Sequence, residues 1–404
     1  NKILIYLLCL ILFMNKKFTF IDLFSGAGGL SCGFEKAGLT CLAGIDFLKP
    51  AIETFKKNHK NAIGIDGDIR KILIKDFKKK IKNQKVNIIC GGPPCQGFST
   101  IGPGDAKDSR NHLFLEFVRF VKELKPEIIV LENVTGLLAK KNIKTLQSIF
   151  NCFEELGYDL NARVLSSHHY GAPQIRRRVI LIGNRIKIEN IYPQKKFSNV
   201  GEISSKLQSP RTVSWAFKNL INFKNKSFNH NIETASIKSE LEISRISHVP
   251  EGKSIRYERD EKKFLPKKLW FNHDWSEIGE KRFREAKFAR LDRSKPSPTI
   301  VTGSRMYYHP IENRYLTTRE AASLQSFPAE FEFFGSITSQ WTQIGNAVPP
   351  LMAEAIGDAV KKMLKNKKKK IKKNKQTNIE FIRSTAFNYD KDVSNQEQQL
   401  ELKL

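Results

Sequence analysis

The chain has 404 residues, of which 40% are hydrophobic, and it carries 69 Lys and Arg against 41 Asp and Glu, a formal net charge of +28. This length allows two domains or one large α/β domain with an insertion, and the hydrophobic content excludes a disordered protein. Ten lysines lie in residues 361–375, so the rest of the chain still carries +18. The charge favours a polyanionic partner, nucleic acid above all, although a compositional habit, seen also in the many Ile, Asn and Phe residues, is an alternative.

The six cysteines form no C-x-x-C pair and lie in no cluster with histidines at metal-ligand spacing. We therefore expect neither a bound metal nor a disulfide framework, and a reducing cytoplasm as the location. The apolar run 3–13 is too short to span a bilayer and has no small-residue cleavage signal after it, so we expect no membrane association. Because residue 1 is Asn and Met14 directly precedes the first predicted strand, we interpret residues 1–13 as a mis-assigned start.

Short apolar runs alternate with amphipathic stretches through residues 14–186, which predicts a catalytic and cofactor-binding α/β domain. Right-handed crossovers would make its sheet parallel, with helices on both faces and ligands at the carboxyl ends of the strands. The predicted strands are 18–24, 41–45, 86–90, 128–131 and 178–183, and the predicted helices are 30–37, 51–58, 113–124 and 143–156.

The regular alternation stops after residue 186, and residues 187–300 are polar and aromatic without a clear period. We expect a second, smaller domain there. Thr317 followed three residues later by Glu320 predicts a capped helix start, and a further helix is predicted over 353–363. Residues 301–362 should thus close the catalytic domain, while 363–404, rich in Lys, Gln and Asn, should be a basic, disordered tail.

Residues 92–99 place Cys95 directly after the apolar run 86–90. Pro93 and Pro94 must end that strand, because proline offers no N–H to a sheet and fixes its own backbone. Cys95 is therefore expected on a loop at a strand's carboxyl end, where nearby N–H groups or cations can favour the reactive thiolate. A buried structural cysteine is the alternative when this loop is considered alone.

Residues 20–30 predict a strand, a glycine-rich turn and a helix, which is an arrangement that lets backbone approach a ligand closely. The turn is not G-x-G-x-x-G, and Asp22 and Ser25 suit a cationic ligand better than a pyrophosphate. Asp46 ends the next strand, where it can bind ribose hydroxyls, and Asp68 follows a third. Each acid alone would more often be a helix cap or a solvated loop residue, but three at successive strand ends suggest S-adenosylmethionine.

Together these segments resemble the DNA cytosine-5 methyltransferases of bacterial type II restriction-modification systems, in the family's linear order over nearly all of residues 18–360. The resemblance implies an α/β, Rossmann-like S-adenosylmethionine-dependent methyltransferase domain with a smaller target-recognition domain over 187–300. The motifs that carry it, besides the glycine-rich turn, are Pro93-Pro94-Cys95-Gln96, Asp108-Ser109-Arg110, Leu131-Glu132-Asn133-Val134, Gln174-Ile175-Arg176-Arg177-Arg178, Arg290-Leu291, Pro298-Thr299-Ile300, Arg319-Glu320-Ala321-Ala322, Leu324-Gln325-Ser326-Phe327-Pro328 and Gly345-Asn346-Ala347-Val348-Pro349-Pro350.

The resemblance also implies roles for individual residues. Cys95 would add to carbon 6 of cytosine, Glu132 would hold a proton at ring nitrogen 3, and Arg178 with Arg176 would bind the base's carbonyl and order the loop. The cofactor-binding residues would be Asp22, Phe24, Ser25, Gly26, Gly28, Asp46, Asp68, Ile69, Pro94, Asn346 and Val348. The residues that contact DNA would be Gln96, Ser99, Arg110 and Arg290.

The expected partners are double-stranded DNA, whose target base must leave the duplex, and a separately encoded restriction endonuclease. We expect a monomer in the cytoplasm, associated with the nucleoid through DNA. The alternatives are an RNA (transfer RNA) cytosine-5 methyltransferase, a noncatalytic DNA-binding regulator and a nicotinamide-dependent oxidoreductase. A recognition insert of this length favours duplex DNA, the joint presence of Cys95 and Glu132 favours an enzyme, and the missing G-x-G-x-x-G disfavours the oxidoreductase.

Overall fold

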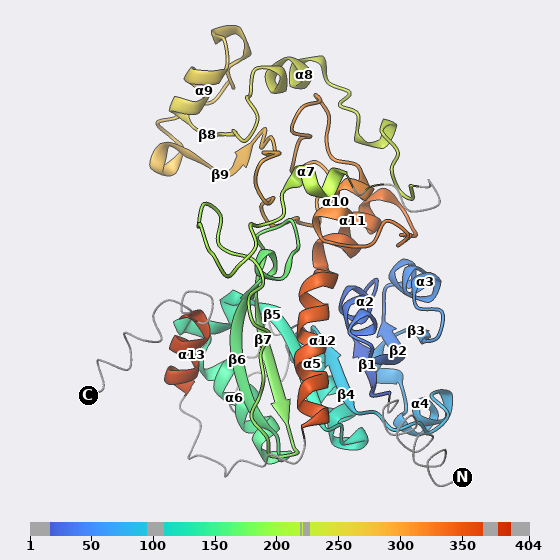
Figure 1. Ribbon diagram of the computed structural model, residues 1–404. Helices are drawn as coiled ribbons and strands as arrows, with labels where there is room; N and C mark the ends of the chain where they lie inside the picture. The colour runs from blue at the N-terminus through green and yellow to red at the C-terminus, as the bar shows by residue number, and fades with distance from the viewer. Residues whose placement is uncertain (1–16, 95–108, 219, 221–226, 367–378, 389–404) are drawn as a thin grey trace, which may run out of the picture.

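The protein has a lower lobe built on one large sheet and an upper lobe with little regular secondary structure (Figure 1). The structure, a computed structural model, describes residues 17–94, 109–218, 220, 227–366 and 379–388. The predictions for residues 1–13 and for Cys95, Gln96 and Ser99 lie outside these ranges.

The sheet of the lower lobe has seven strands in the order β3-β2-β1-β4-β5-β7-β6. The first five are parallel neighbours as predicted, but β7 runs antiparallel to both β5 and β6. The prediction of a fully parallel sheet is therefore wrong at this edge, because the short connection from β6 to β7 can join only antiparallel strands. The strands are β1 Thr19–Leu23, β2 Thr40–Asp46, β3 Ile63–Asp66, β4 Ile88–Gly91, β5 Ile128–Val134, β6 Asp159–Ser166 and β7 Arg177–Asn184.

Helices cover both faces of the sheet, as the strand pattern predicts, because successive side chains of a strand point to opposite faces. Ile21 and Ile129 pack into a core shared with α4, α5 and α6. Their neighbours Phe20 and Ile128 pack into a second core shared with α2, α3 and α12. The helices are α2 Gly29–Lys36, α3 Lys49–Asn58, α4 Ile74–Lys80, α5 Ser109–Leu124, α6 Ile143–Glu155 and α12 Pro350–Lys365.

Helix α13 (Ile379–Asn388) packs on the outer strand β6 and on α6 (Figure 1). Its Ile379, Ile382 and Ala386 are buried in the same core as Ile21. The prediction of a disordered tail over 363–404 is wrong for this segment, since apolar residues three and four positions apart form one face of a helix.

The upper lobe has its own hydrophobic cluster, which joins Ile255 of β8 and Trp275 to Tyr308 and Tyr315. Ile188, in contrast, packs with the large sheet. The predicted boundary at 187 thus divides the core of the large sheet. The boundary at 300 divides the cluster of the upper lobe, because the chain returns to this lobe after residue 300. The elements here are α8 Glu240–Ser247, β8 Ile255–Tyr257, α9 Glu258–Phe264 and β9 Arg282–Lys287.

The segment after residue 316 closes the lower lobe. Thr317 caps α10 (Thr318–Leu324) through the reciprocal bonds with Glu320 that the sequence predicts. Helix α11 (Ile337–Asn346) follows, and α12 then packs along α2 beside the sheet (Figure 1). In the described part of the chain, no helix has the length and apolar character needed to cross a membrane.

Candidate active site

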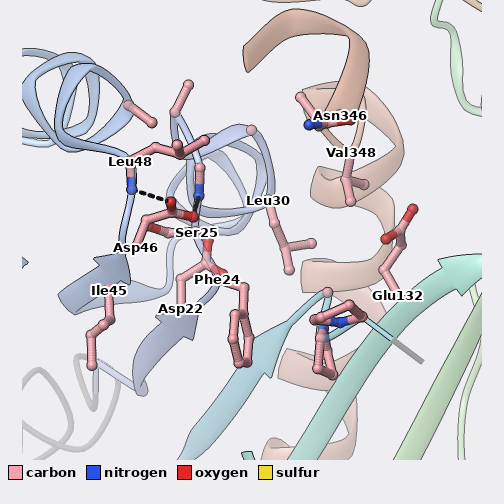
Figure 2. A pocket seen from close by; sticks show the side chains of 18 of the residues that line it. Asp22, Phe24, Ser25, Leu30, Ile45, Asp46, Leu48, Glu132, Asn346 and Val348 are labelled. Atoms are coloured by element: carbon pink, nitrogen blue, oxygen red, sulfur yellow. Dashed lines mark hydrogen bonds between the residues drawn. The ribbon is translucent and has the colours of Figure 1, made fainter. Parts of the chain in front are cut away.

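A cavity of about 700 Å³ lies at the carboxyl ends of β1, β2, β4 and β5 (Figure 2). Its size falls in the range of pockets that hold cofactors and small ligands. Most of the residues predicted for the site line it together, although they come from segments far apart in the sequence. They are Asp22, Phe24, Ser25, Gly26, Asp46, Asp68, Ile69, Pro94, Glu132, Arg176, Arg178, Asn346 and Val348.

The glycine-rich turn forms one wall of this cavity. The backbone enters the left-handed region at Phe24 (φ 61°) and Gly26 (φ 52°), so the chain turns sharply where β1 leaves the sheet. Among the described residues, no atom lies within 4 Å of where a Cβ of Gly26 would be. The backbone at Gly26 is therefore open to a ligand, as predicted for a turn of this composition.

Asp46, at the end of β2, is held by two backbone N–H groups. Its Oδ2 accepts from the N–H of Gly26 at 2.8 Å and its Oδ1 from the N–H of Leu48 at 2.9 Å (Figure 2). Burial raises the pKa of Asp46, and these two hydrogen bonds oppose the shift. Each carboxylate oxygen has a further lone pair, so the group has a fixed orientation and can still accept hydroxyl donors.

Asp22 lies deeper, with only 1% of its surface exposed. Ser31 donates its hydroxyl to Oδ2 at 2.7 Å, yet burial raises the pKa of Asp22 to about 7, with a smaller contribution from the charge of Asp46. A cationic ligand nearby would favour the ionised form. The hydroxyl of Ser25, also buried in this wall, has no hydrogen-bond partner among the residues that the structure describes. Buried polar groups are rarely left unpaired, so Ser25 suits a polar ligand.

The cavity is also lined by residues that the sequence did not predict, among them Phe47 and Leu48. Phe47 and Leu48 directly follow Asp46 at the rim of the cavity, and Phe47 is 68% exposed. Large aromatic side chains usually bury most of their surface, so an exposed ring at a cavity's rim is available to a ligand. In the sequence, the feature that could have indicated Phe47 is its position directly after Asp46, the acid at the end of a predicted strand.

Glu132 and two arginines form the opposite wall. Glu132 of β5 is paired with Ile180 of β7. Arg178 is two residues before Ile180 in β7, so its side chain lies on the same face of the sheet as that of Glu132. The Arg178 Nε lies 2.9 Å from the Glu132 Oε1. Desolvation raises the pKa of Glu132 even though Arg178 and Arg176 lower it. A carboxyl group with a raised pKa holds a proton closer to neutral pH, which is what a general acid requires.

Arg176 is almost fully buried beside this pair. It donates from Nη1 to the carbonyl oxygen of Ile300 at 3.2 Å, and burial lowers its pKa to about 9. Asn133, next to Glu132, donates from Nδ2 to the carbonyl oxygen of Pro93 at 3.1 Å. This bond holds the backbone at Pro93, two residues before Cys95 in the sequence.

Gly28, predicted as a cofactor-binding residue, is not among the described residues that line the cavity. A Cβ at this position would lie 2.2 Å from the Nε2 of His59, and the backbone has φ 90°. Gly28 is therefore needed for close packing and for the start of α2.

The prediction that Arg290 contacts DNA is wrong for this structure. Its side chain is only 6% exposed and cannot reach DNA as it stands. A guanidinium has five N–H donors, and all five are used within the protein. The acceptors, at 2.7 to 3.1 Å, are the carbonyl oxygens of Ile246, Val249, His309 and Glu312 and the Oδ1 of Asn313. Arg110 lies in α5, and its side chain is outside the described part of the structure.

Comparison with known proteins agrees with this site. The family model for C-5 cytosine-specific DNA methylases matches residues 18–362. The Type II methyltransferase M1.HphI of Haemophilus parahaemolyticus is 34% identical over 373 residues, 90% of this chain and 94% of its own. M.NgoFVII of Neisseria gonorrhoeae is 36% identical over 337 residues, 82% of this chain and 83% of its own.

Solved structures show the same fold. An E. coli protein described as a DNA modification methyltransferase encoded within a prophage has a TM-score of 0.64 and 25% identity, covering 87% of this chain and all of that one. Since the matches cover most of the chain and the matching family and relatives are DNA methyltransferases, the RNA-modifying and noncatalytic alternatives are not supported. The chain belongs to the C-5 cytosine-specific DNA methylase family and is a DNA methyltransferase.

Proposed function

We propose that the protein transfers a methyl group from S-adenosylmethionine to carbon 5 of a cytosine within a short, specific sequence of duplex DNA. The observation that carries this proposal is that one cavity has a fixed carboxylate, Asp46, at one side and the Glu132–Arg178 pair at the other. The first suits a ribose and the second suits a pyrimidine ring that gains charge during reaction.

S-adenosylmethionine, when bound, supplies the electrophilic methyl group. Asp46 would accept hydrogen bonds from its ribose, and Phe24, Phe47 and Ile69 offer apolar surface to its adenine. The hydroxyl of Ser25, which has no partner among the described residues, offers it a hydrogen-bonding group at the cavity wall. The remaining wall, which would face the methionine part, is formed by Asn346, at the end of α11, and Val348, just before α12 (Figure 2).

The protein's own residues would make the base reactive. Carbon 5 of cytosine is a weak nucleophile until the Cys95 thiolate adds to carbon 6 and forms a C–S bond. Glu132 would donate its proton to ring nitrogen 3 as this bond forms, and Arg178 would hold the carbonyl. After carbon 5 takes the methyl group it loses its proton to a base, the C–S electrons return to sulfur, and Glu132 recovers its proton.

The setting we propose is a type II restriction-modification system, in which methylation protects DNA from a separately encoded endonuclease. The relatives' names support it. The upper lobe would read base edges while basic side chains hold phosphates. The protein would act as a monomer, in the cytoplasm, at the nucleoid.

The test is to incubate the purified protein with labelled S-adenosylmethionine and mixed-sequence duplex DNA, and to map methylated cytosines by bisulfite sequencing. Methylation confined to one short motif, and absent in the Cys95→Ser variant, supports the proposal and supplies the recognition sequence. Transfer to transfer RNA but not to DNA, or label that persists in the variant, would contradict it.

A further inference from the structure

Two glutamines that face one another, Gln174 and Gln325, lie fully buried between the lobes. The Gln174 Nε2 donates to the Gln325 Oε1 at 2.8 Å, so the two side-chain amides are directly linked. They are 151 positions apart in the sequence. Each comes from a motif of the family resemblance, but neither lines the cavity among the described residues.

The two amides continue into hydrogen bonds at either end. On one side, the Gln325 Nε2 donates to the carbonyl oxygen of Ile344 at 2.6 Å, two residues before Asn346 at the end of α11. On the other side, the Gln174 Oε1 accepts from the N–H of Ile300 at 2.6 Å. The carbonyl oxygen of Ile300 in turn accepts from Arg176 at 3.2 Å.

A continuous chain of buried hydrogen bonds thus joins Arg176 on one wall of the cavity to the helix end that carries Asn346 on another. Amides in a dry interior must find partners, because an unsatisfied buried donor or acceptor costs about 1 to 3 kcal/mol. Each amide has a fixed donor side and a fixed acceptor side. All of these hydrogen bonds therefore form together in only one relative placement of the segments that contain Gln174, Ile300 and Gln325. An apolar pair would fill the same space without this constraint.

We infer that Gln174 and Gln325 are positioning residues, which hold the base-binding arginines in register with the cofactor end of the cavity. The inference rests on the proposed function, since the cavity walls it aligns are those assigned to the base and the cofactor. Gln174 is two residues from Arg176 and four from Arg178, so a shift of its backbone moves both guanidinium groups.

A merely structural role is the competing explanation, and the chain offers a matched control. Gln340 is also buried, in α11. Its Nε2 donates to the carbonyl oxygen of Gly335 at 2.9 Å, and its Oε1 accepts from Asn229 at 3.3 Å. In the described part of the chain neither of these partners lines the cavity. Both Gln325→Leu and Gln340→Leu therefore remove a buried side-chain amide, but only Gln325→Leu breaks the proposed chain of hydrogen bonds.

The experiment compares these variants in steady-state methylation of the mapped DNA sequence, well below their melting temperatures, with active sites counted by bound S-adenosylmethionine. Gln325→Leu should lower kcat roughly 10- to 100-fold, with the KM for both substrates changed less than about threefold, because orientation is lost rather than affinity. Gln340→Leu should lose stability but keep its kcat within about twofold. The combined Gln174→Leu and Gln325→Leu variant should lose far less than the product of the two single losses.

Two further readouts separate positioning from folding. Gln325→Glu can still accept from Gln174, but it can donate to Ile344 only when protonated, so its kcat relative to wild type should rise as the pH falls. We expect S-adenosylhomocysteine to tighten duplex binding by the wild-type protein, because the proposed link aligns the two binding sites. This tightening factor, measured by fluorescence anisotropy without turnover, should fall in Gln325→Leu and not in Gln340→Leu. Equal kcat values and equal tightening factors in these two variants would overturn the inference. Failure of the wild-type protein to methylate DNA would instead overturn the proposed function.

Discussion

The two lobes bury charged side chains for different purposes. In the lower lobe, Asp22 and Glu132 lie in a cavity where burial raises the pKa of each. In the upper lobe, Arg290 bonds five acceptors, and Arg314 makes two bonds of 2.8 Å to the carboxylate of Glu320 in the adjoining helix α10. Short irregular segments leave many backbone carbonyls without partners in helices or sheets, and buried arginines satisfy them. A basic residue in the upper lobe is therefore not by itself a DNA contact.

The largest expected effect on activity is that of Glu132→Gln. The amide keeps the shape but cannot deliver a proton to the ring, so kcat should fall roughly 1,000-fold, about 4 kcal/mol, with little change in Tm. Steady-state methylation and thermal unfolding check this. Glu127→Gln, just before β5, is the control and should keep full activity. A large loss of Tm in Glu132→Gln would mean that this charge is structural, like those of the upper lobe.

Asp22→Asn should change the pH dependence of stability. Because its pKa rises from the ordinary 3.8 to about 7 in the folded protein, ionisation of Asp22 opposes folding. The stability present below pH 4 is lost as the pH rises to about 7, and the full shift corresponds to about 4 kcal/mol at 1.36 kcal/mol per pKa unit. In urea unfolding at pH 5 and pH 8, the free energy of unfolding of Asp22→Asn relative to wild type should be higher at pH 8 than at pH 5. If the difference in free energy of unfolding between Asp22→Asn and wild type is the same at both pH values, ionisation of Asp22 does not oppose folding.

Arg290→Met should destabilise the upper lobe by about 3 to 4 kcal/mol, because it leaves several buried carbonyls without donors. Arg293→Met is the control, since Arg293 is exposed and paired with Glu251 at 3.0 Å, and surface pairs contribute about 1 kcal/mol or less. Thermal unfolding measures both. If Arg290→Met instead keeps its stability and lowers the salt dependence of DNA binding, Arg290 contacts phosphate and the comparison of the lobes fails.

The smallest effect is expected in α13. Ile382→Ala removes a side chain buried against the large sheet and should cost about 2 kcal/mol. Phe381→Ala, in the same helix, removes a ring that is 61% exposed and should change stability by less than about 0.5 kcal/mol. Equal, negligible effects in urea unfolding would show that α13 does not stabilise the lower lobe.

The sequence predicted the central strands, because the largely apolar runs at 18–24 and 128–131 have the length of strands that are buried on both faces. The capping box at Thr317 was also legible, since its two partners are three residues apart. The lysine-rich block before it obscured α13, because the whole segment from residue 363 was assigned by its composition rather than by the spacing of its apolar residues. The burial of Arg290 could not be predicted, because its acceptors come from distant turns, and the same is true of the Gln174–Gln325 link.

The central claim is that one cavity holds the cofactor and an extruded cytosine beside Cys95. The most direct measurement uses duplex DNA in which the mapped cytosine is replaced by 5-fluorocytosine. Once a methyl group has been added, no proton remains on carbon 5 to be removed, so the C–S bond cannot break. With S-adenosylmethionine, wild-type protein should give a methylated complex that survives denaturing electrophoresis, with none for Cys95→Ser and slow formation for Glu132→Gln. A wild-type protein that methylates ordinary cytosine but forms no such complex would contradict the account.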